Sequence, residues 1–419
     1  MIMIKRSLLA QLELHLASRE ISLIVGPRQA GKTTLMLILK KALEEQGLPT
    51  VYLNLDIEAD MRHLYSQEAL VRKIELEVGK MKAFVFIDEI QRKENAGLFL
   101  KGLYDMGLPH KFIVSGSGSV ELKEKIHESL VGRKRVFELN PLSFDEFANF
   151  KTEDRYSDRI SAYLRSEPEK ARHLLEEYMN FGGYPRVALA ENIGAKQGEI
   201  AEIYQSYLEK DIVYLLQVKK SDALSRLVRI LAAQSGRLVN ITGLSSELGI
   251  ATSTIKDYLW YLEKTFIVRR VTPFFRNIRK EIRKSPLFYF YDLGLRNYAA
   301  GAFGRLNANE EGFVFQNCVF NWMSEITKSG APEIHFWQTA DGSEVDFVLE
   351  MAREVVPIEV KYSWLKKPSV PRGLRSFILR YKPAKACVVN RILKETVEIE
   401  KTRVAFIPFF ELSEEILSL

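Results

Sequence analysis

The sequence predicts an α/β protein in three parts: a parallel sheet with helices on both faces, a mostly helical middle, and a second α/β region. Three observations support this prediction. The 419 residues are too many for one ordinary core. Short apolar runs without polar alternation recur in residues 1–150, as expected of buried parallel strands. Helical patterns dominate residues 151–300, and strand-like runs return in residues 301–419.

Composition excludes several classes of protein. With 47% hydrophobic and 27% charged residues, the chain can bury cores and stay soluble, so it is neither largely disordered nor fibrous. No apolar run approaches the roughly 18 residues of a membrane helix, and no signal peptide is recognisable at the start. Cys318 and Cys387 are too few for a disulfide framework, and the six histidines are scattered. We therefore expect a cytoplasmic protein without zinc.

Four apolar runs predict the strands of the first part, at residues 21–25, 51–55, 84–87 and 112–114. Residues 33–46 carry an apolar stripe at helical spacing and predict a helix. Open parallel sheets bind ligands at the carboxyl ends of their strands. The residues that follow these runs are therefore the first candidates for a site.

A phosphate-binding loop follows the first predicted strand. Residues 26–33 match G-x-x-x-x-G-K-(S/T), between an apolar strand and an apolar-striped helix, as this motif requires. Glycines let backbone N–H groups approach phosphates, Lys32 brings a charge to the β- and γ-phosphates, and the Thr33 hydroxyl can ligate Mg²⁺. ATP and Mg²⁺ are the expected cofactors. The predicted nucleotide-binding residues are Gly26, Pro27, Arg28, Gln29, Ala30, Gly31, Lys32, Thr33 and Thr34.

Two adjacent carboxylates end the third predicted strand. We assign Asp88 to the Mg²⁺ ion and Glu89 to the base that activates the attacking water. Ser115 or Ser117, after the fourth strand, could place a hydroxyl near the γ-phosphate, although a serine-rich turn is about as good a reading. Arg133 could stabilise transition-state charge in its own site or a neighbour's, or be a solvated charge.

These runs resemble a known family. The stretches GPRQAGKTT, FVFIDEIQ, VSGSGS and GRKRVFELNPLSFDEF look like AAA+-type P-loop ATPases of archaea and bacteria that carry a C-terminal DUF4143 domain, the AAA_14 and DUF4143 pair. The resemblance continues through residues 182–185, 292–296 and 312–317, so it covers most of the chain. It implies ATP hydrolysis by a P-loop NTPase domain and says little about biological role.

The middle part carries a helix-turn-helix pattern. A short helix before Gly249 is followed by a second with apolar residues at helical spacing, and Thr252, Ser253, Thr254 and Lys256 lie at its start, where DNA contacts are made. Residues 266–271 read as a strand. Together they predict a winged-helix domain, used either for DNA or only for packing and protein contacts.

A basic stripe follows that strand. Residues 269–284 contain seven Lys or Arg residues against Glu281 alone, a surplus equal to the +6 net charge of the whole chain. Such a stripe attracts nucleic acid, or is a solvated hairpin. The candidate DNA-binding residues in it are Arg276, Arg279, Lys280, Arg283 and Lys284.

The third part resembles the PD-(D/E)xK nuclease core. If residues 352–353 form a hairpin turn, Asp346 lies beside Glu359, with Lys361 on the same face. Two carboxylates and a lysine could hold a second Mg²⁺, at the edge of a mixed sheet. The resemblance implies a helix glutamate where this chain has Gln316, which brings no charge. Cleavage should therefore be weak or absent. An ordinary surface hairpin is the alternative.

The leading hypothesis is thus an ATPase whose C-terminal parts engage DNA. Two alternatives stay open: a nucleotide-controlled switch that binds DNA or protein with little turnover, and an active ATP-regulated nuclease. A ring, a dimer and a monomer are all compatible with the sequence, so a homo-oligomer is possible.

Overall fold

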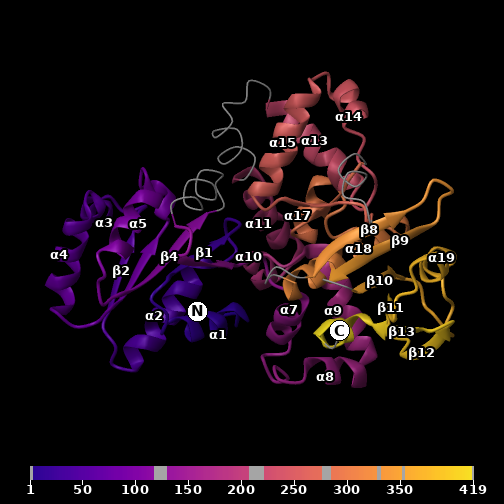
Figure 1. Ribbon diagram of the computed structural model, residues 1–419, viewed down its shortest axis with the longest axis horizontal. Coiled ribbons are helices and arrows are strands. Elements are labelled where there is room, and N and C mark those ends of the chain that lie inside the picture. Colours follow the sequence, from indigo (N-terminus) through magenta and orange to yellow (C-terminus); the bar gives the residue numbers. More distant parts are fainter. Residues whose placement is uncertain are drawn as a thin grey trace. The chain divides into compact units, whose positions relative to one another are not determined.

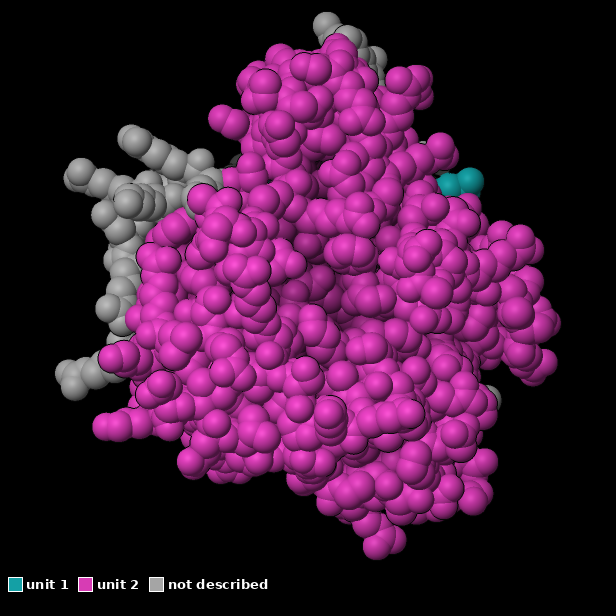
Figure 2. Space-filling view, turned by 90° about the vertical axis from the view of Figure 1, so that its right-hand side faces the viewer, with its two compact units in different colours: residues 1–142, 205–216, 260–267 teal, residues 143–204, 217–259, 268–419 magenta. Residues whose placement is uncertain are grey.

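The computed structural model describes residues 3–117, 130–206, 221–275, 285–327, 332–351 and 354–417 (Figure 1). Contacts divide it into two compact units, coloured separately in Figure 2. Unit 1 takes the described residues of 1–142, 205–216 and 260–267, and unit 2 takes the described residues of 143–204, 217–259 and 268–419. The division into three parts at residues 150 and 300 stays a prediction.

Unit 1 is built on a parallel sheet, which in the described residues has five strands in the order β2-β3-β4-β1-β5. The four runs predicted as strands occur as β1 to β4, so the predicted parallel sheet is confirmed. Every residue of β1 and β3 is buried, which explains why these runs show no polar alternation. The bounds are β1 Ile21–Gly26, β2 Thr50–Asn54, β3 Phe84–Asp88, β4 Lys111–Ser117 and β5 Lys134–Glu138.

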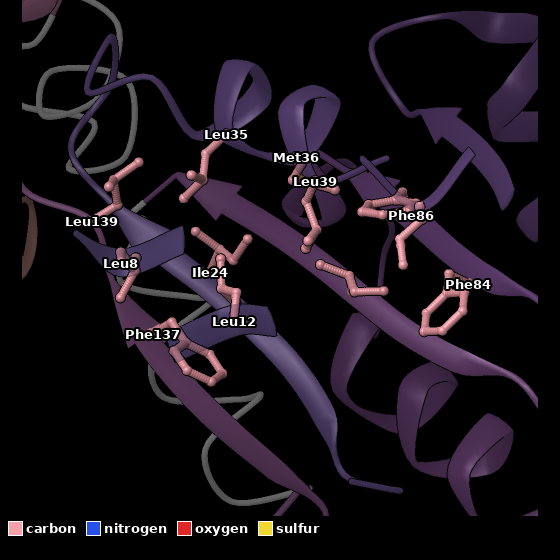
Figure 3. Packing of buried hydrophobic residues seen from close by; sticks show 12 residues of the cluster. Leu8, Leu12, Ile24, Leu35, Met36, Leu39, Phe84, Phe86, Phe137 and Leu139 are labelled. Carbon is pink, nitrogen blue, oxygen red and sulfur yellow. The ribbon is translucent and has the colours of Figure 1, made fainter. Parts of the chain in front are cut away.

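Helices cover this sheet, with α1 and α2 on one side and α5 on the other (Figure 1). The helix predicted over residues 33–46 is α2. Leu8 and Leu12 of α1 and Leu35 of α2 pack against Ile24 and Phe86 of the sheet, in a cluster of fully or nearly fully buried side chains (Figure 3). The bounds are α1 Leu8–His15, α2 Lys32–Glu45, α3 Glu58–Met61, α4 Gln67–Val78 and α5 Ala96–Asp105.

Helices dominate the first half of unit 2. The turn predicted at residues 182–185 is confirmed, because α9 ends at Gly182 and α10 begins at Pro185. The helix predicted over residues 200–216 begins earlier, at Ile193, and residues 207–216 lie outside the described residues. The bounds are α7 Phe144–Lys151, α8 Ile160–Ser166, α9 Pro168–Phe181, α10 Pro185–Leu189, α11 Ile193–Gln205 and α13 Ser221–Ala233.

The predicted helix pair is present. Helix α14 (Ile241–Leu248) is capped by the side chain of Asn240 and ends at Gly249, which has a left-handed backbone. Helix α15 (Thr252–Lys264) follows after a short turn. A two-stranded antiparallel sheet of β6 (Val268–Val271) and β7 (Leu287–Phe290) comes next in the chain. The strand predicted from residue 266 starts two residues later, because Phe266 has a left-handed backbone with φ 62°.

A mixed sheet forms the end of unit 2, and in the described residues its strand order is β12-β13-β11-β10-β9-β8. All five strands predicted in this part occur, as β8 to β11 and β13, whereas β12 and β7 were not predicted. Because β9 and β10 are inner strands, the prediction that they lie at the edge of the sheet is wrong. The bounds are β8 Glu333–Gln338, β9 Glu344–Met351, β10 Glu354–Val360, β11 Lys385–Asn390, β12 Glu395–Ile399, β13 Thr402–Pro408, α17 Leu293–Ala299, α18 Ala308–Ile326, α19 Arg372–Tyr381 and α20 Leu412–Leu417.

A buried carboxylate ties α9 to α17. Asp292 caps α17 by accepting the N–H of Leu295 at 2.7 Å, and its other oxygen accepts the N–H of Gly183 at 2.7 Å. Burial raises the pKa of Asp292 to about 6, although these backbone donors oppose the rise. A Cβ atom on Gly294 would lie 2.1 Å from the carbonyl oxygen of Phe181. Only glycine therefore lets the two segments approach.

Gly294→Ala should lower the free energy of unfolding of unit 2 by about 1–3 kcal/mol or more, because the new methyl group displaces backbone. Denaturant unfolding measures this. The matched control is Gly198→Ala in α11, where the added Cβ meets nothing within 4 Å. That control should be neutral or stabilising by about 0.5–1 kcal/mol. Equal unfolding midpoints for the two variants would contradict the close-approach explanation.

Candidate functional site

The loop between β1 and α2 has the backbone that the phosphate-binding motif requires. Gly26 ends β1, and a Cβ atom there would lie 2.1 Å from the carbonyl oxygen of Leu139. Gly31, with φ 96°, has a left-handed backbone and directly precedes the first residue of α2. The free N–H groups of the first helical turn therefore point toward the loop, as at other anion-binding helix starts.

Lys32 lies over this loop and is almost fully buried. Its ammonium group donates to the carbonyl oxygens of Gly26 at 3.1 Å and Pro27 at 2.7 Å. Arg6 donates to the carbonyl oxygen of Ala30 at 2.8 Å and so fixes the loop from the far N-terminal segment. Thr34 is exposed on α2, whereas Arg28 and Gln29 are half-buried in the loop.

Asp88, at the carboxyl end of β3, is fully buried and collects donors from several elements. The Thr33 hydroxyl donates to its Oδ2 at 2.6 Å, and the Tyr52 hydroxyl donates to the same oxygen at 3.0 Å. The Ser115 hydroxyl and the N–H of Glu89 donate to Oδ1. The structure thus brings together Thr33, Asp88 and Ser115, as the sequence predicted for the strand ends.

Tyr52 is a site residue that the sequence analysis missed. Burial, and then the Asp88 carboxylate, raise the pKa of its hydroxyl above the ordinary range, so it stays a donor. Tyr52 reaches Asp88 because β2 and β3 pair in parallel register, with Asn54 opposite Asp88. Its only signal in the sequence is a polar group inside an apolar run. Arg6 was missed too, since no local motif contains it.

Glu89 has a left-handed backbone with φ 58°, a conformation that costs a non-glycine residue of order 1 kcal/mol. Its N–H donates to the Ser115 hydroxyl at 3.3 Å, and the side-chain amide of Gln91 donates to its carboxylate. The strained backbone aims this carboxylate away from β3 while keeping it one residue from Asp88. Ser117 ends β4, and its side chain lies outside what the structure describes.

Oxygen ligands suit Mg²⁺, and the pair of Thr33 hydroxyl and Asp88 carboxylate supplies them beside the loop. The residues therefore fit an Mg²⁺ ion bound with a nucleotide. Arg133 does not join them. It precedes β5, whose Lys134 pairs with Ile21 at the start of β1, so it lies at the opposite edge of the sheet from Gly26. Its guanidinium donates to Asp105 at 2.8 Å. A role for Arg133 in the same site is thus contradicted, and a role in a neighbouring copy stays a prediction.

A second group of predicted residues meets in unit 2. The side-chain amide of Gln316, on α18, donates to Asp346 Oδ1 at 2.7 Å, and the N–H of Val360 donates to Asp346 Oδ2 at 2.7 Å. The Lys361 ammonium donates to Glu359 Oε1 at 2.7 Å. The strand register shifts at β8 opposite Asp346, and this irregularity turns its side chain toward α18.

These two carboxyl groups lack the features of a Mg²⁺ site. Burial and the Glu359 charge raise the pKa of Asp346 well above its usual range, and burial raises that of Glu359, opposed by Lys361. Both Asp346 oxygens already accept protein donors, so they are not free for a metal. No group of three or more His, Cys, Asp or Glu side chains in the described ranges could hold a metal ion. The second Mg²⁺ site therefore finds no support in the geometry.

The predicted DNA-binding residues are only partly described. Thr252, Ser253 and Lys256 are exposed on the first turns of α15, and Thr254 is half-buried. Arg276, Arg279, Lys280, Arg283 and Lys284 lie outside the described residues. Arg269, from the same stripe, stacks over the Tyr291 ring at 4.1 Å. That cation therefore contacts protein as well as solvent.

Helices long and apolar enough to cross a bilayer are absent from the described part of the chain. Family models match three stretches: an AAA domain over residues 18–148, a domain of unknown function (DUF8612) over residues 172–306, and a domain of unknown function (DUF4143) over residues 311–411.

Relatives match nearly the whole chain. An uncharacterized protein of Mycobacterium tuberculosis is 27% identical over 93% of this chain and 80% of its own length. An uncharacterized protein of Methanocaldococcus jannaschii is 26% identical over 96% of this chain and 90% of its own. Among solved structures, the replication initiator DnaA bound to AMPPCP and single-stranded DNA is similar with a TM-score of 0.30 and 14% identity, covering 62% of this chain and 90% of that one. The matched AAA and DUF4143 domains confirm the family predicted from the motifs, and the chain belongs to the AAA+-type P-loop proteins with a C-terminal DUF4143 domain.

Proposed function

We propose that this protein binds and hydrolyses ATP in unit 1 and that unit 2 engages DNA. The hydrogen bond of 2.6 Å between the Thr33 hydroxyl and Asp88 carries the first half of this proposal. It joins the loop motif to the strand-end carboxylate, two elements that are 55 residues apart in the chain. Such a pairing is what P-loop nucleotide hydrolases use to hold phosphates and metal together.

Each residue then has a definite task. The loop N–H groups and Lys32 bind the β- and γ-phosphates, with the helix start adding positive potential. Thr33 and Asp88 hold Mg²⁺, which when bound offsets charge on the phosphates. Glu89 accepts the proton of the attacking water, and the Ser115 hydroxyl, already hydrogen-bonded to Asp88, fixes the position of that carboxylate.

Support for DNA engagement comes from unit 2. Thr252, Ser253 and Lys256 are exposed at the start of a helix that follows a short turn, an arrangement that suits phosphate and base-edge contacts. The basic stripe of residues 269–284 is close by in the chain. We interpret α14, α15 and the β6–β7 ribbon as a winged helix on this basis.

One observation favours a second candidate function, a nucleotide-controlled switch with slow turnover. The Gln91 amide donates to the Glu89 carboxylate, so the base is held by a protein group instead of facing only water. A held base would allow ATP binding while hydrolysis stays slow. Variants at Gln91 separate the two candidates.

Lys32→Ala should weaken MgATP binding by about 10- to 100-fold, because a charge-assisted hydrogen bond is worth about 1.5–3 kcal/mol. Calorimetric titration with MgATP measures this affinity. Lys41→Ala is the matched control, since Lys41 is on the same helix but exposed and paired with Glu45. If Lys32→Ala kept the wild-type affinity, the loop would not be the nucleotide site.

Glu89→Gln should bind ATP almost as wild type does but hydrolyse it about 10²- to 10⁴-fold more slowly, because only the base is removed. Gln91→Ala should raise turnover if the held base limits the reaction. Steady-state phosphate release measures both. Loss of ATP binding in Glu89→Gln would contradict the division of roles between Asp88 and Glu89.

Lys256→Ala should weaken duplex DNA binding and reduce the slope of log K against log salt by about 0.9, the value of one lost phosphate contact. Replacing Arg276, Arg279, Arg283 and Lys284 with Ala should flatten the slope further. Lys170→Ala, at an exposed position of α9, serves as the control. A slope unchanged in every variant would show that neither surface contacts DNA.

A further inference from the structure

Unit 2 contains a pocket of about 340 Å³ that the functions above leave unused. It is lined by the segment between α13 and α14, by α18 and by the strands β7, β8 and β9. The side chains used below are Arg237, Leu238, Phe313, Gln316 and Asp346. All of these elements belong to the same compact unit, whose surface is hollowed on the face shown in Figure 2.

Gly236 keeps one side of this pocket open. Its backbone is left-handed with φ 77°, which favours glycine, and a Cβ atom there would lie 3.1 Å from Gln316 Oε1. The same Cβ would lie 3.4 Å from the Tyr289 hydroxyl. The missing side chain therefore leaves two polar groups uncovered toward the pocket.

One of these polar groups is unsatisfied. The Tyr289 side chain is fully buried, and its hydroxyl has no hydrogen-bond partner among the described residues. Leaving a buried hydroxyl unpaired costs about 1–3 kcal/mol, so a ligand that bonds to it gains that much locally. Gln316 is held in place by its amide bond to Asp346, which leaves its carbonyl oxygen toward Gly236. Donor and acceptor groups thus lie together at the pocket floor.

A flat surface forms the wall. The Arg237 guanidinium lies 4.5 Å from the centre of the Phe313 ring, so the two planar groups stack at the pocket. Phe336 and the apolar side chains of Leu238 and Leu287 complete the lining. Planar stacking surfaces above a floor of mixed donors and acceptors match the faces and edge of a single nucleobase.

Charge selects a nucleic acid over a basic peptide as the occupant. The N–H of Phe274 donates to the carbonyl oxygen of Phe336 at 2.6 Å, and Leu287 lines the pocket directly. The sequence that joins Phe274 to Leu287 carries the five candidate cations Arg276, Arg279, Lys280, Arg283 and Lys284 against Glu281 alone. That joining sequence lies mostly outside the described residues and is not part of the site. The chain entering and leaving the pocket is nevertheless strongly basic, which favours a polyanion.

We propose that this pocket receives one unpaired base of a DNA strand, stacked on Phe313 and hydrogen-bonded by Gln316 and Tyr289. The proposal rests on the DNA engagement proposed above and specifies what is recognised: a base that is out of a duplex. A pocket of this volume accommodates one base with its sugar and excludes a base pair.

The test compares two single strands of about 20 nucleotides, one with all its bases and one abasic, which carry the same backbone charge. Fluorescence anisotropy should show the wild type binding the base-containing strand about 10-fold more tightly, as expected for stacking of one base. Leu238→Trp fills the pocket from an exposed position and should remove that preference. Leu379→Trp, at an exposed position on α19, should behave as the wild type.

Phe313→Ala provides a second route if Leu238→Trp does not fold. It should lose about 10-fold in affinity for the base-containing strand and nothing for the abasic strand. Equal wild-type affinity for both strands, a preference that Leu238→Trp retains, or tighter binding of a lysine-rich peptide would each overturn the pocket assignment. In those cases DNA engagement through Lys256 survives if its salt slope still changes. Absence of binding to any DNA would overturn both proposals.

Discussion

The nucleotide site depends on one interaction, the buried carboxylate of Asp88 with its ring of donors. Removing a carboxylate from water costs several kcal/mol unless it is hydrogen-bonded. Here Thr33, Tyr52, Ser115 and the Glu89 amide supply the donors, from α2, β2, β4 and the turn after β3. All of them reach Asp88 only because the strands are parallel and end at one edge of the sheet. The fold and the site are therefore stabilised by the same contacts.

The carboxylate pair of unit 2 shows the same chemistry with a different outcome. Asp346 and Glu359 lie next to each other, and each raises the cost of charge on the other site through burial and repulsion. Gln316, Val360 and Lys361 satisfy three of the four oxygens, while Glu359 Oε2 stays buried without a partner in the described residues. This pair is suited to holding a proton or a hydrogen-bonding ligand, and it is poorly suited to a divalent cation.

Local chemistry explains which features could be predicted from the sequence. The phosphate loop and its helix occupy consecutive residues, so the motif fixes the backbone, and the buried strands of unit 1 are visible as apolar runs. Features that join distant segments could not be predicted. Arg6 reaches the loop from outside the motif, and Tyr52 reaches Asp88 through strand register. The register shift at Asp346 and the contact of Gly294 with Phe181 likewise depend on tertiary packing. Arg133 was placed near the site because it is basic, although β5 begins at the far edge of the sheet.

The most direct test of the account is the Mg²⁺ dependence of ATP affinity in Asp88→Asn, compared with the wild type. The amide keeps the size of the side chain but removes the charge that holds the metal beside Thr33. The account predicts that Mg²⁺ strengthens ATP binding by about tenfold or more in the wild type and has little effect in Asp88→Asn, a difference of about 1.4 kcal/mol. The same Mg²⁺ dependence in both proteins would contradict it, because Asp88 would then organise the fold without taking part in the nucleotide site.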